Sequence, residues 1–176
     1  MADTSQPTVL DYATGSQWRL AFNRLPKTTW FCTAANVPGI NLGEAQYPTP
    51  LHDLYLIGDK LTFENLTITF IVDEELENYR ELWNWLVGMG APQKYSQWVD
   101  ELKKGTGNVV QKGENYSDAT LIVYNSKNVP KVNVNFKNMF PTSLSSLEYS
   151  QELSDVEYFK ATASFRYFYY EFETIT

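Results

Sequence analysis

The residue types with the most chemical potential in this chain are its single histidine and its single cysteine. A Ser-His-Asp or Cys-His pair would have to use His52, which stands beside Asp53 with no nucleophile motif nearby. His52 is therefore interpreted as a polar residue on a surface segment. Cys32 lies between Phe31 and Thr33 among strand-forming residues, so a small buried hydrophobe is expected there instead of a reactive thiol. A lone cysteine also excludes an internal disulfide and a cysteine zinc site.

Carboxylates gather at Asp73, Glu74 and Glu75, and a divalent cation prefers such oxygen ligands. A helix that begins here accounts for all three without a metal, because Asp73 can cap its amino end and the glutamates suit the positive end of its dipole. The glycines around Gly105 and Gly107 match neither a phosphate loop nor a dinucleotide fingerprint, since no Gly-Lys-Ser/Thr sequence follows them. The sequence therefore predicts no enzyme, no cofactor and no metal site.

Composition limits the class of protein. The 176 residues suit one domain with a core, and 43% hydrophobic and 20% charged residues are typical of a globular chain. Aromatic residues make up 15%, which favours a β-rich fold. The net charge of −7 argues against proteins that grip DNA phosphates, but not against a passage through which DNA slides. Residues 1–8 lack a signal-peptide pattern, and no apolar run nears the roughly 20 residues that cross a bilayer, so we expect no membrane insertion.

One helix is predicted, over Glu74–Met89, because apolar residues recur there at helical spacing. The two tryptophans of this segment cannot share a face, since residues two apart on a helix point in different directions. We expect Trp83 in the core and Trp85 facing a neighbour. Glycines at 88 and 90 and Pro92 should end the helix. The expected apolar stripe consists of Leu76, Tyr79, Leu82, Trp83 and Leu86.

The remaining elements are strands, which alternate apolar and polar residues. They are expected at 18–22, 28–35, 61–72, 118–124 and 131–137, with a last, long strand over 157–176. The fold class is therefore mainly β, an antiparallel sheet rolled into a barrel or sandwich with one main helix. We expect a single domain over 1–176, with an arm at 1–15 and an insertion or loop at 91–115 that could hold a short helix at 95–103.

Residues 40–60 form a long segment with prolines and no clean period. A segment of that length in a small domain is usually functional or mobile, and its apolar cluster argues against simple mobility. We interpret it as an interaction loop. The cluster consists of Leu51, Leu54, Tyr55, Leu56 and Ile57.

The carboxy-terminal residues stop alternating after Arg166 and become aromatic on both faces. A small domain rarely has enough core to cover both faces, so a second copy of the chain is expected to supply the cover. The strand predicted to lie between subunits carries Phe165, Tyr167, Phe168, Tyr169, Tyr170 and Phe172.

Four segments together resemble the tail tube proteins of contractile-tailed bacteriophages, the T4-like family, which is related to the inner tube proteins of type VI secretion systems. The first is FCTAANVPG at 31–39, a strand that ends in a Pro-Gly turn. The second is LTFENLTITFIVDE at 61–74, a strand that runs into an acidic helix start. The third spans 119–149 and contains KNMFPTSL, and the fourth is the closing strand at 159–172. They cover most of the chain in the order of the family.

The resemblance implies a virion structural protein, assembled in the host cytoplasm, without enzymatic activity. Its hexameric rings would complete one β-barrel around a lumen and stack into a tube inside a contractile sheath. The genome would pass through the lumen without specific binding, and negative charge there would keep the passage slippery. The partners would be the sheath protein and the baseplate or terminator proteins at the tube ends. The segment 40–60 would be the inter-ring stacking loop.

Alternatives stay open at this point. The segment 91–113 is longer than a bare tube subunit needs, so it could face the sheath or mark a specialised paralogue, such as a baseplate initiator or a tail terminator that forms one ring. A secretion-type inner tube subunit would carry effectors instead of DNA. A soluble β-barrel that binds a small ligand would be a stable monomer with a closed apolar cavity.

Overall fold

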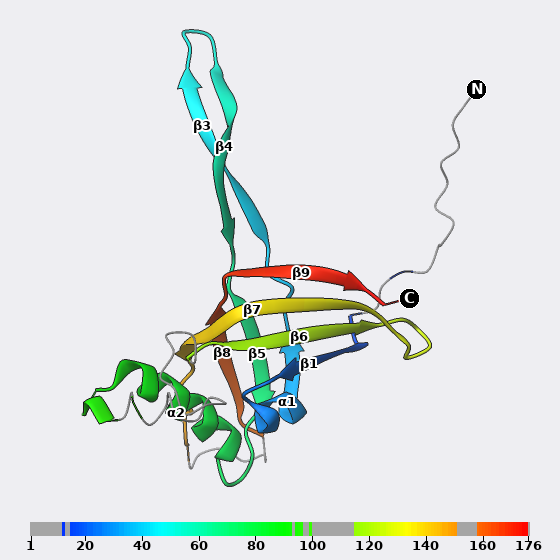
Figure 1. The fold of residues 1–176 in the computed structure, drawn as a ribbon, viewed down its shortest axis with the longest axis vertical. Helices are drawn as coiled ribbons and strands as arrows, with labels where there is room; N and C mark the ends of the chain where they lie inside the picture. Colours follow the sequence, from blue (N-terminus) through cyan, green and yellow to red (C-terminus); the bar gives the residue numbers. More distant parts are fainter. Residues whose placement is uncertain are drawn as a thin grey trace.

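The computed structural model describes residues 12, 15–92, 94–96, 99, 115–150 and 158–175. Two antiparallel sheets share one long strand and cross at a steep angle, as the horizontal and vertical arrows in Figure 1 show. The first sheet has the order β1-β6-β7-β9, with β1 at Trp18–Phe22, β6 at Ser117–Tyr124, β7 at Pro130–Leu144 and β9 at Tyr169–Thr174. The second has the order β7-β8-β5-β2, with β8 at Lys160–Arg166, β5 at Leu66–Ile71 and β2 at Cys32–Ala35.

The core forms where the inner faces of the two sheets meet. Along β5, Leu66, Ile68 and Phe70 are buried while the residues between them are half-buried, as the alternation predicts. The ring of Phe165 lies 5.4 Å from that of Phe22, which joins β8 to β1 across the core. The expected mainly β, antiparallel fold is confirmed.

The segment expected to be a strand at 28–35 begins instead as a helix, α1, at Pro26–Phe31, and only Cys32–Ala35 is extended. Pro26 occupies the start of this helix, where its missing N–H and fixed φ cost nothing. The Thr29 hydroxyl donates to the Leu25 carbonyl at 2.9 Å and accepts the Phe22 N–H at 3.2 Å. These bonds fasten α1 to β1, and they depend on the fold rather than on local alternation.

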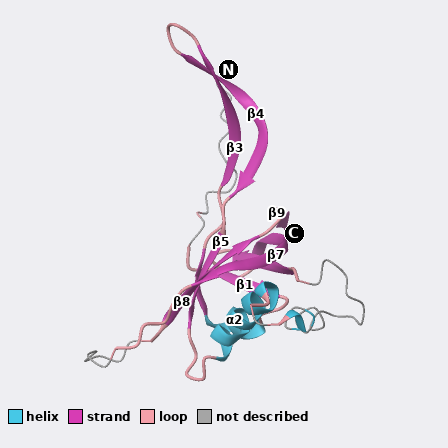
Figure 2. Cartoon of the chain, turned by 90° about the vertical axis from the view of Figure 1, so that its left-hand side faces the viewer, coloured by secondary structure: helices cyan, strands magenta, loops and turns pink. Residues whose placement is uncertain are grey.

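The main helix, α2, spans Glu77–Gly90 rather than Glu74–Met89. The chain enters it through Leu76, whose φ of 56° lies in the left-handed region. Leu76, and not the expected Asp73, is the N-cap residue, and its side chain makes no capping bond. Asp73 still bonds the first turn, because its Oδ1 accepts the N–H of Asn78 at 3.3 Å while the Asn78 Oδ1 accepts the Asp73 N–H at 3.4 Å. Figure 2 shows α2 lying beside the strands of the body, below the hairpin.

The expected roles of the two tryptophans on α2 are reversed. Trp85 is 1% exposed and Trp83 is 52% exposed. The Trp85 ring lies 4.9 Å from the Arg24 guanidinium and 6.4 Å from the Phe165 ring, and its Nε1 donates to the Asn115 carbonyl at 3.1 Å. Trp85 thus has a partner for its polar atom inside the fold, whereas Trp83 faces outward.

Residues 40–60 form two strands and not a loop. β3 at Ile40–Pro48 and β4 at Asp53–Phe63 pair with each other in a sheet of their own. This hairpin, which includes the turn at 49–52, projects far above the body (Figure 1). Consequently the strand expected at 61–72 divides into the end of β4 and a separate β5. No core lies beneath the hairpin, so its strands lack the alternation that would have shown them.

The carboxy-terminal segment is likewise two strands instead of one. β8 runs between β5 and β7, and β9 then leaves this sheet to pair with the other half of β7. The break falls at Tyr167 and Phe168, and the Phe168 N–H donates to the Lys137 carbonyl at 3.0 Å. Because the chain changes sheets there, the aromatic residues before and after the break belong to different surroundings.

The segment expected to be an insertion at 91–115 falls largely outside the described residues, as does most of the short helix expected at 95–103. Among the described residues, no three metal-ligating side chains come together. Within the same part of the chain, no helix is long and apolar enough to cross a membrane.

Candidate functional site

The two residues considered for catalysis, His52 and Cys32, lie in separate elements of the fold. His52 is exposed in the turn of the hairpin, where its N–H donates to Thr49 Oγ1 at 3.3 Å. Cys32 lies at the start of β2, and burial raises the pKa of its thiol to about 11. The thiol is therefore protonated at neutral pH and does not offer a thiolate.

The hairpin carries apolar side chains on both of its halves. Near the base, Ile40 pairs with Phe63 and Leu42 with Leu61, so these four side chains share one face. Nearer the tip, the pairs Ala45–Leu56 and Tyr47–Leu54 form an apolar face. The register shifts between these halves, and the even-numbered residues of β3 give way to the odd-numbered ones as the apolar set. Successive residues of a strand point to opposite faces, so the apolar face changes sides along the hairpin.

Two glycines make this change of face possible. A Cβ placed on Gly58 would lie 2.4 Å from the carbonyl oxygen of Gly43, so the two backbones approach as closely as they do only because Gly58 has no side chain. This close approach of β3 and β4 coincides with the register shift between Leu42 and Glu44. The hairpin therefore has a proximal and a distal half, joined at a pair of glycines.

The residues predicted at 51–57 are all exposed. Leu51 in the turn is 94% exposed and Ile57 in β4 is 86% exposed, while Leu54, Tyr55 and Leu56 are also open to solvent. Contiguous apolar exposure of this kind is uncommon on the surface of a monomeric protein. The structure does not bring these residues together with the other predicted set at 165–172, of which Tyr167 and Tyr170 bond the base of the hairpin.

Two tyrosines of the carboxy-terminal segment anchor the base of the hairpin. The Tyr167 hydroxyl donates to the Glu64 carbonyl at 2.9 Å, and the Tyr170 hydroxyl donates to the Pro38 carbonyl at 3.0 Å. The ring of Phe63 packs edge-on against both, with centroids 5.9 and 5.7 Å away. Burial, foremost, raises the pKa of Tyr167 to about 12. These contacts join the base of the hairpin to the carboxy-terminal segment, which was expected to contact a neighbouring subunit.

The aromatic residues expected between subunits divide into two groups. Phe165 and Tyr167 are buried in the core of their own chain, so the expectation that a second copy must cover them is corrected. Phe168, Tyr169 and Phe172 are exposed. Phe172 pairs with Val134 and therefore lies on the core-facing side of β9, yet it remains 63% exposed. The core of one copy ends before it reaches this residue.

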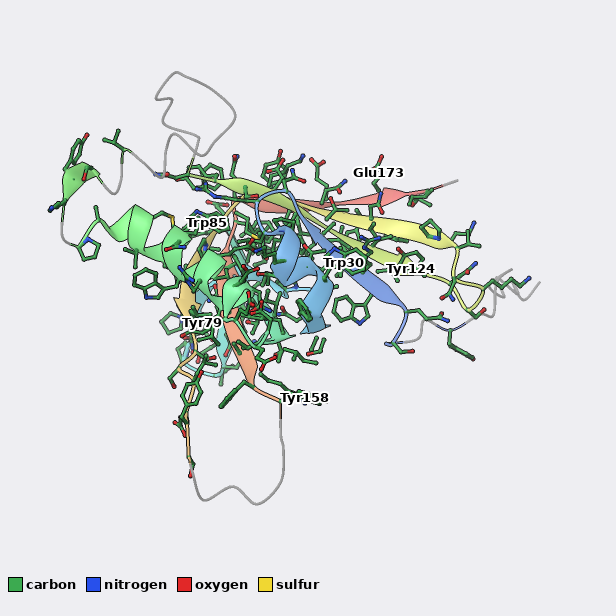
Figure 3. All side chains as sticks on the ribbon, turned by 90° about the horizontal axis from the view of Figure 1, so that it is seen from below. Trp30, Tyr79, Trp85, Tyr124, Tyr158 and Glu173 are labelled. Carbon is green, nitrogen blue, oxygen red and sulfur yellow. The ribbon has the colours of Figure 1, made fainter. Side chains whose placement is uncertain are left out.

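The outer face of the first sheet is polar. Cross-strand register aligns Arg19, Ile122, Asn133 and Glu173 in one row. The next row consists of Ala21, Thr120, Asn135 and Glu171. The Thr120 hydroxyl donates to Asn135 Oδ1 at 3.0 Å, and Asn135 Nδ2 donates to Glu173 at 3.1 Å. Figure 3 shows Glu173 and Tyr124 on the strands of this sheet.

The sequence patterns did not predict an exposed tryptophan on α1 or the groove that it lines. Trp30 on α1 is 79% exposed, and the Arg19 guanidinium lies 5.8 Å from its ring. Both residues line an open groove of about 590 Å³ between β1 and the α1–β2 segment. An aromatic residue among threonines in a segment expected to be a strand gave no sign that it would stand on a short exposed helix.

Comparison with known proteins places this geometry in a family. The family model described as phage tail tube protein matches residues 8–173. No curated protein sequence matches the chain.

Several solved structures share the fold at low sequence identity. A chain from the anti-feeding prophage cap, a tube-terminating cap, is 17% identical with a TM-score of 0.57, covering 99% of this chain and 100% of its own. A chain from the sheath–tube complex of an extracellular contractile injection system is 13% identical with a TM-score of 0.54, covering 99% and 100%. A chain from the sheath/tube terminator of that kind of system is 14% identical with a TM-score of 0.56, covering 94% and 99%.

The family model spans nearly the whole chain. This chain belongs to the phage tail tube protein family.

Proposed function

We propose that the chain is a structural subunit of a contractile tail tube, which forms stacked hexameric rings whose lumen conducts the genome during ejection. The family match over residues 8–173 and one observation carry the proposal: a hairpin exposed on both faces projects from a body that offers it no core. A lone chain gains nothing from such a hairpin, whereas a polymer can bury it. The role is structural and calls for no catalytic residue.

Within a ring, the edge formed by β9 is the proposed contact between neighbouring subunits. Phe168, Tyr169 and Phe172 are exposed there, and the outer edge of β9 has no partner strand among the described residues. A neighbour that covers Phe172 would continue the core of this chain into its own. Phe165, Tyr167 and Tyr170 support this edge from inside their own chain.

Between rings, the hairpin is the proposed stacking element. Its apolar side chains lie on a segment that reaches well beyond the body (Figure 1). Such head-to-tail contacts use two different surfaces of one subunit, so they can continue through many rings.

The polar face of the first sheet is the surface that we assign to the lumen. Its carboxylates, Asp118, Glu171 and Glu173, share this face with the cations Lys131 and Lys137. Lys137 pairs with Asp118 at 3.2 Å. The negative lumen expected from the net charge is thus modified to a wall of mixed charge and amides, which offers a phosphate backbone little net attraction.

The partners follow from this role. A sheath protein would surround the tube, and baseplate or terminator proteins would meet its ends. The assembly would take place in the host cytoplasm and yield part of a virion, with no membrane insertion by this chain. DNA would pass without specific binding.

A second candidate function is a single ring at one end of a tube. Two of the compared structures are described as a tube-terminating cap and a sheath/tube terminator, and this likeness of fold favours the alternative. A terminator would form discrete rings, whereas a main tube subunit would form filaments.

Electron micrographs of the purified protein, with sedimentation to size the rings, test the proposal. We expect sixfold rings that stack into filaments. Leu56→Asp should leave rings but prevent filaments, because a carboxylate buried in the stacking contact costs several kcal/mol. Val129→Asp, which adds the same charge at an exposed apolar residue outside the hairpin, is the matched control and should leave filaments intact. A protein that stays monomeric at all concentrations would contradict the proposal.

A further inference from the structure

The two sheets that share β7 form one continuous path of strands, β1-β6-β7-β8-β5-β2. The two ends of this path are β1 and β2. The groove of about 590 Å³ lies between these two end strands. Neither strand has a second partner among the described residues. We call this feature the end-strand groove, and it is lined by Gly15, Ser16, Trp18, Arg19, Leu20, Thr29, Trp30, Cys32 and Thr33.

The lining of the end-strand groove is aromatic and carries one cation. Trp18 is half-buried and Trp30 is exposed, so both present ring surface to whatever enters. Arg19 lies over the Trp30 ring, and no lining residue is a carboxylate. An apolar segment with acidic residues beside it suits such a groove, because the rings accept aliphatic side chains and the guanidinium accepts a carboxylate.

The distal half of the hairpin has this chemistry. Leu51 and Ile57 are its most exposed apolar residues, and Glu44 and Asp53 flank them. The distal half, from Glu44 to Ile57, contains no lysine or arginine. Charge and apolar surface are therefore complementary between the distal half and the end-strand groove.

The two features lie at opposite ends of the molecule. The hairpin rises from one end of the body in Figure 1, while α1 lies near the other end. Figure 3, seen from below, shows Trp30 beside α1. A hairpin therefore cannot reach the groove of its own chain, but it can reach the groove of a chain stacked on it.

We infer that the distal half of the hairpin of one copy seats in the end-strand groove of a second copy, with the apolar tip against Trp18 and Trp30 and a hairpin carboxylate beside Arg19. This inference rests on the proposed stacking of rings and adds the receiving surface, which that proposal does not identify. The contact is heterologous, so each copy gives one hairpin and receives one.

The single cysteine permits a direct test. Cys32 lies in the end-strand groove, so a Leu51→Cys variant of the full chain carries one thiol in the groove and one at the hairpin tip. A disulfide requires Cα atoms about 4.4–6.8 Å apart, so mild oxidation joins only thiols that meet. We expect a ladder of linked chains on a non-reducing gel, with a peptide that joins position 51 of one chain to Cys32 of another.

Two controls make the result specific. Ser126→Cys places an equally exposed thiol in the turn between β6 and β7 and should give no link to Cys32. A second pair, Leu51→Cys with Thr33→Cys in a Cys32→Ser chain, moves the groove thiol to an exposed position and should restore the ladder if the burial of Cys32 slows its reaction.

A substitution without cross-linking provides an independent reading. Trp30→Asp should abolish filaments and leave hexameric rings, because it removes the indole surface that receives the hairpin. Trp83→Asp, at another exposed tryptophan outside the groove, should leave filaments intact.

The outcomes separate this inference from the function on which it rests. Filaments that form normally in Trp30→Asp, or filaments without a link from position 51 to the groove in either thiol pair, would overturn the inference while the tube function stands. A link between two groove thiols would also overturn it, since it would indicate groove-to-groove packing. A protein that never polymerises would overturn both.

Discussion

At the scale of single residues, Trp85 holds α2 to the body. It packs against Phe165 and Arg24 and bonds the Asn115 carbonyl, so it links the helix to three separate segments. Its position two residues after Trp83 gave no means of choosing between them, because each lies in an apolar-rich turn. The choice depends on Arg24 and Asn115, which are remote in sequence, and these contacts appear only in the folded chain.

We predict that Trp85→Ala destabilises the protein by about 3–5 kcal/mol, because it removes a large buried side chain and leaves a cavity. Trp83→Ala, the matched control on the same helix, should change the free energy of unfolding by no more than about 0.5 kcal/mol. Urea unfolding of both variants, at a protein concentration that keeps the chain unassembled, measures the difference. Equal effects would contradict the assignment of Trp85 to the core.

The half-buried carboxyl group of Glu81 makes part of the stability depend on pH. Burial raises the pKa of Glu81, and its Oε2 has no hydrogen-bond partner within the described chain. A raised pKa means that the folded chain binds the proton more tightly than the unfolded chain does. The stability that Glu81 contributes is therefore fully present below its pKa in the unfolded chain. That contribution is lost as the pH rises through its pKa in the folded chain.

We predict that Glu81→Gln is more stable than the parent protein at about pH 8 and that the difference disappears towards about pH 4, where Glu81 is protonated. Glu77→Gln should show the opposite dependence, because the bond and charge of Lys27 lower the pKa of Glu77. Urea unfolding across this pH range measures both. A pH-independent difference between Glu81→Gln and the parent would rule out the buried carboxyl as its source.

At the scale of elements, sequence patterns found the strands that cover the core and missed those that do not. Alternation identified β1, β5, β6 and the first half of β7 because each has one face in the core. The hairpin has no such face, and its register shift at Gly43 further disrupts the period. Composition alone predicted an apolar interaction segment here, and its role remains a prediction.

We predict that Gly58→Ala prevents filaments without unfolding the body. The added methyl would meet the Gly43 carbonyl, so β3 and β4 could no longer approach each other this closely. Gly90→Ala is the matched control, since a Cβ there has no atom within 4 Å. Thermal unfolding should show similar midpoints for both variants, and micrographs should show filaments only for Gly90→Ala. Filaments in Gly58→Ala would show that the close approach of β3 and β4 is not required for stacking.

At the scale of the whole molecule, the carboxy-terminal aromatic residues are only partly covered by the core of a single chain. The first of them complete the core, and the last of them extend past its end. The sequence predicted their apolar character on both faces, but it could not place the point at which the chain changes sheets. That point decides which aromatic residues remain uncovered: Phe168, Tyr169 and Phe172.

We predict that Phe172→Asp shifts the protein from rings to monomers, because the carboxylate would be buried without a partner in the contact between neighbours. The substitution should cost the lone chain little, since Phe172 is already exposed. Val129→Asp, at an exposed apolar residue in the turn between β6 and β7, should leave rings unchanged. Sedimentation velocity distinguishes the two, and a full hexamer in Phe172→Asp would exclude this edge as the contact.

The chain of hydrogen bonds from Thr120 through Asn135 to Glu173 has a consequence for traffic along the proposed lumen. These three side chains already bond one another and have few unused donors and acceptors to offer a passing molecule, whereas Asn133 Oδ1 on the same face has no partner among the described residues. Friction against such a surface is low for a nucleic acid and a polypeptide alike, because each step of a sliding chain breaks few bonds with the wall. Low friction would then come from internal satisfaction of the wall, more than from repulsion of its cargo.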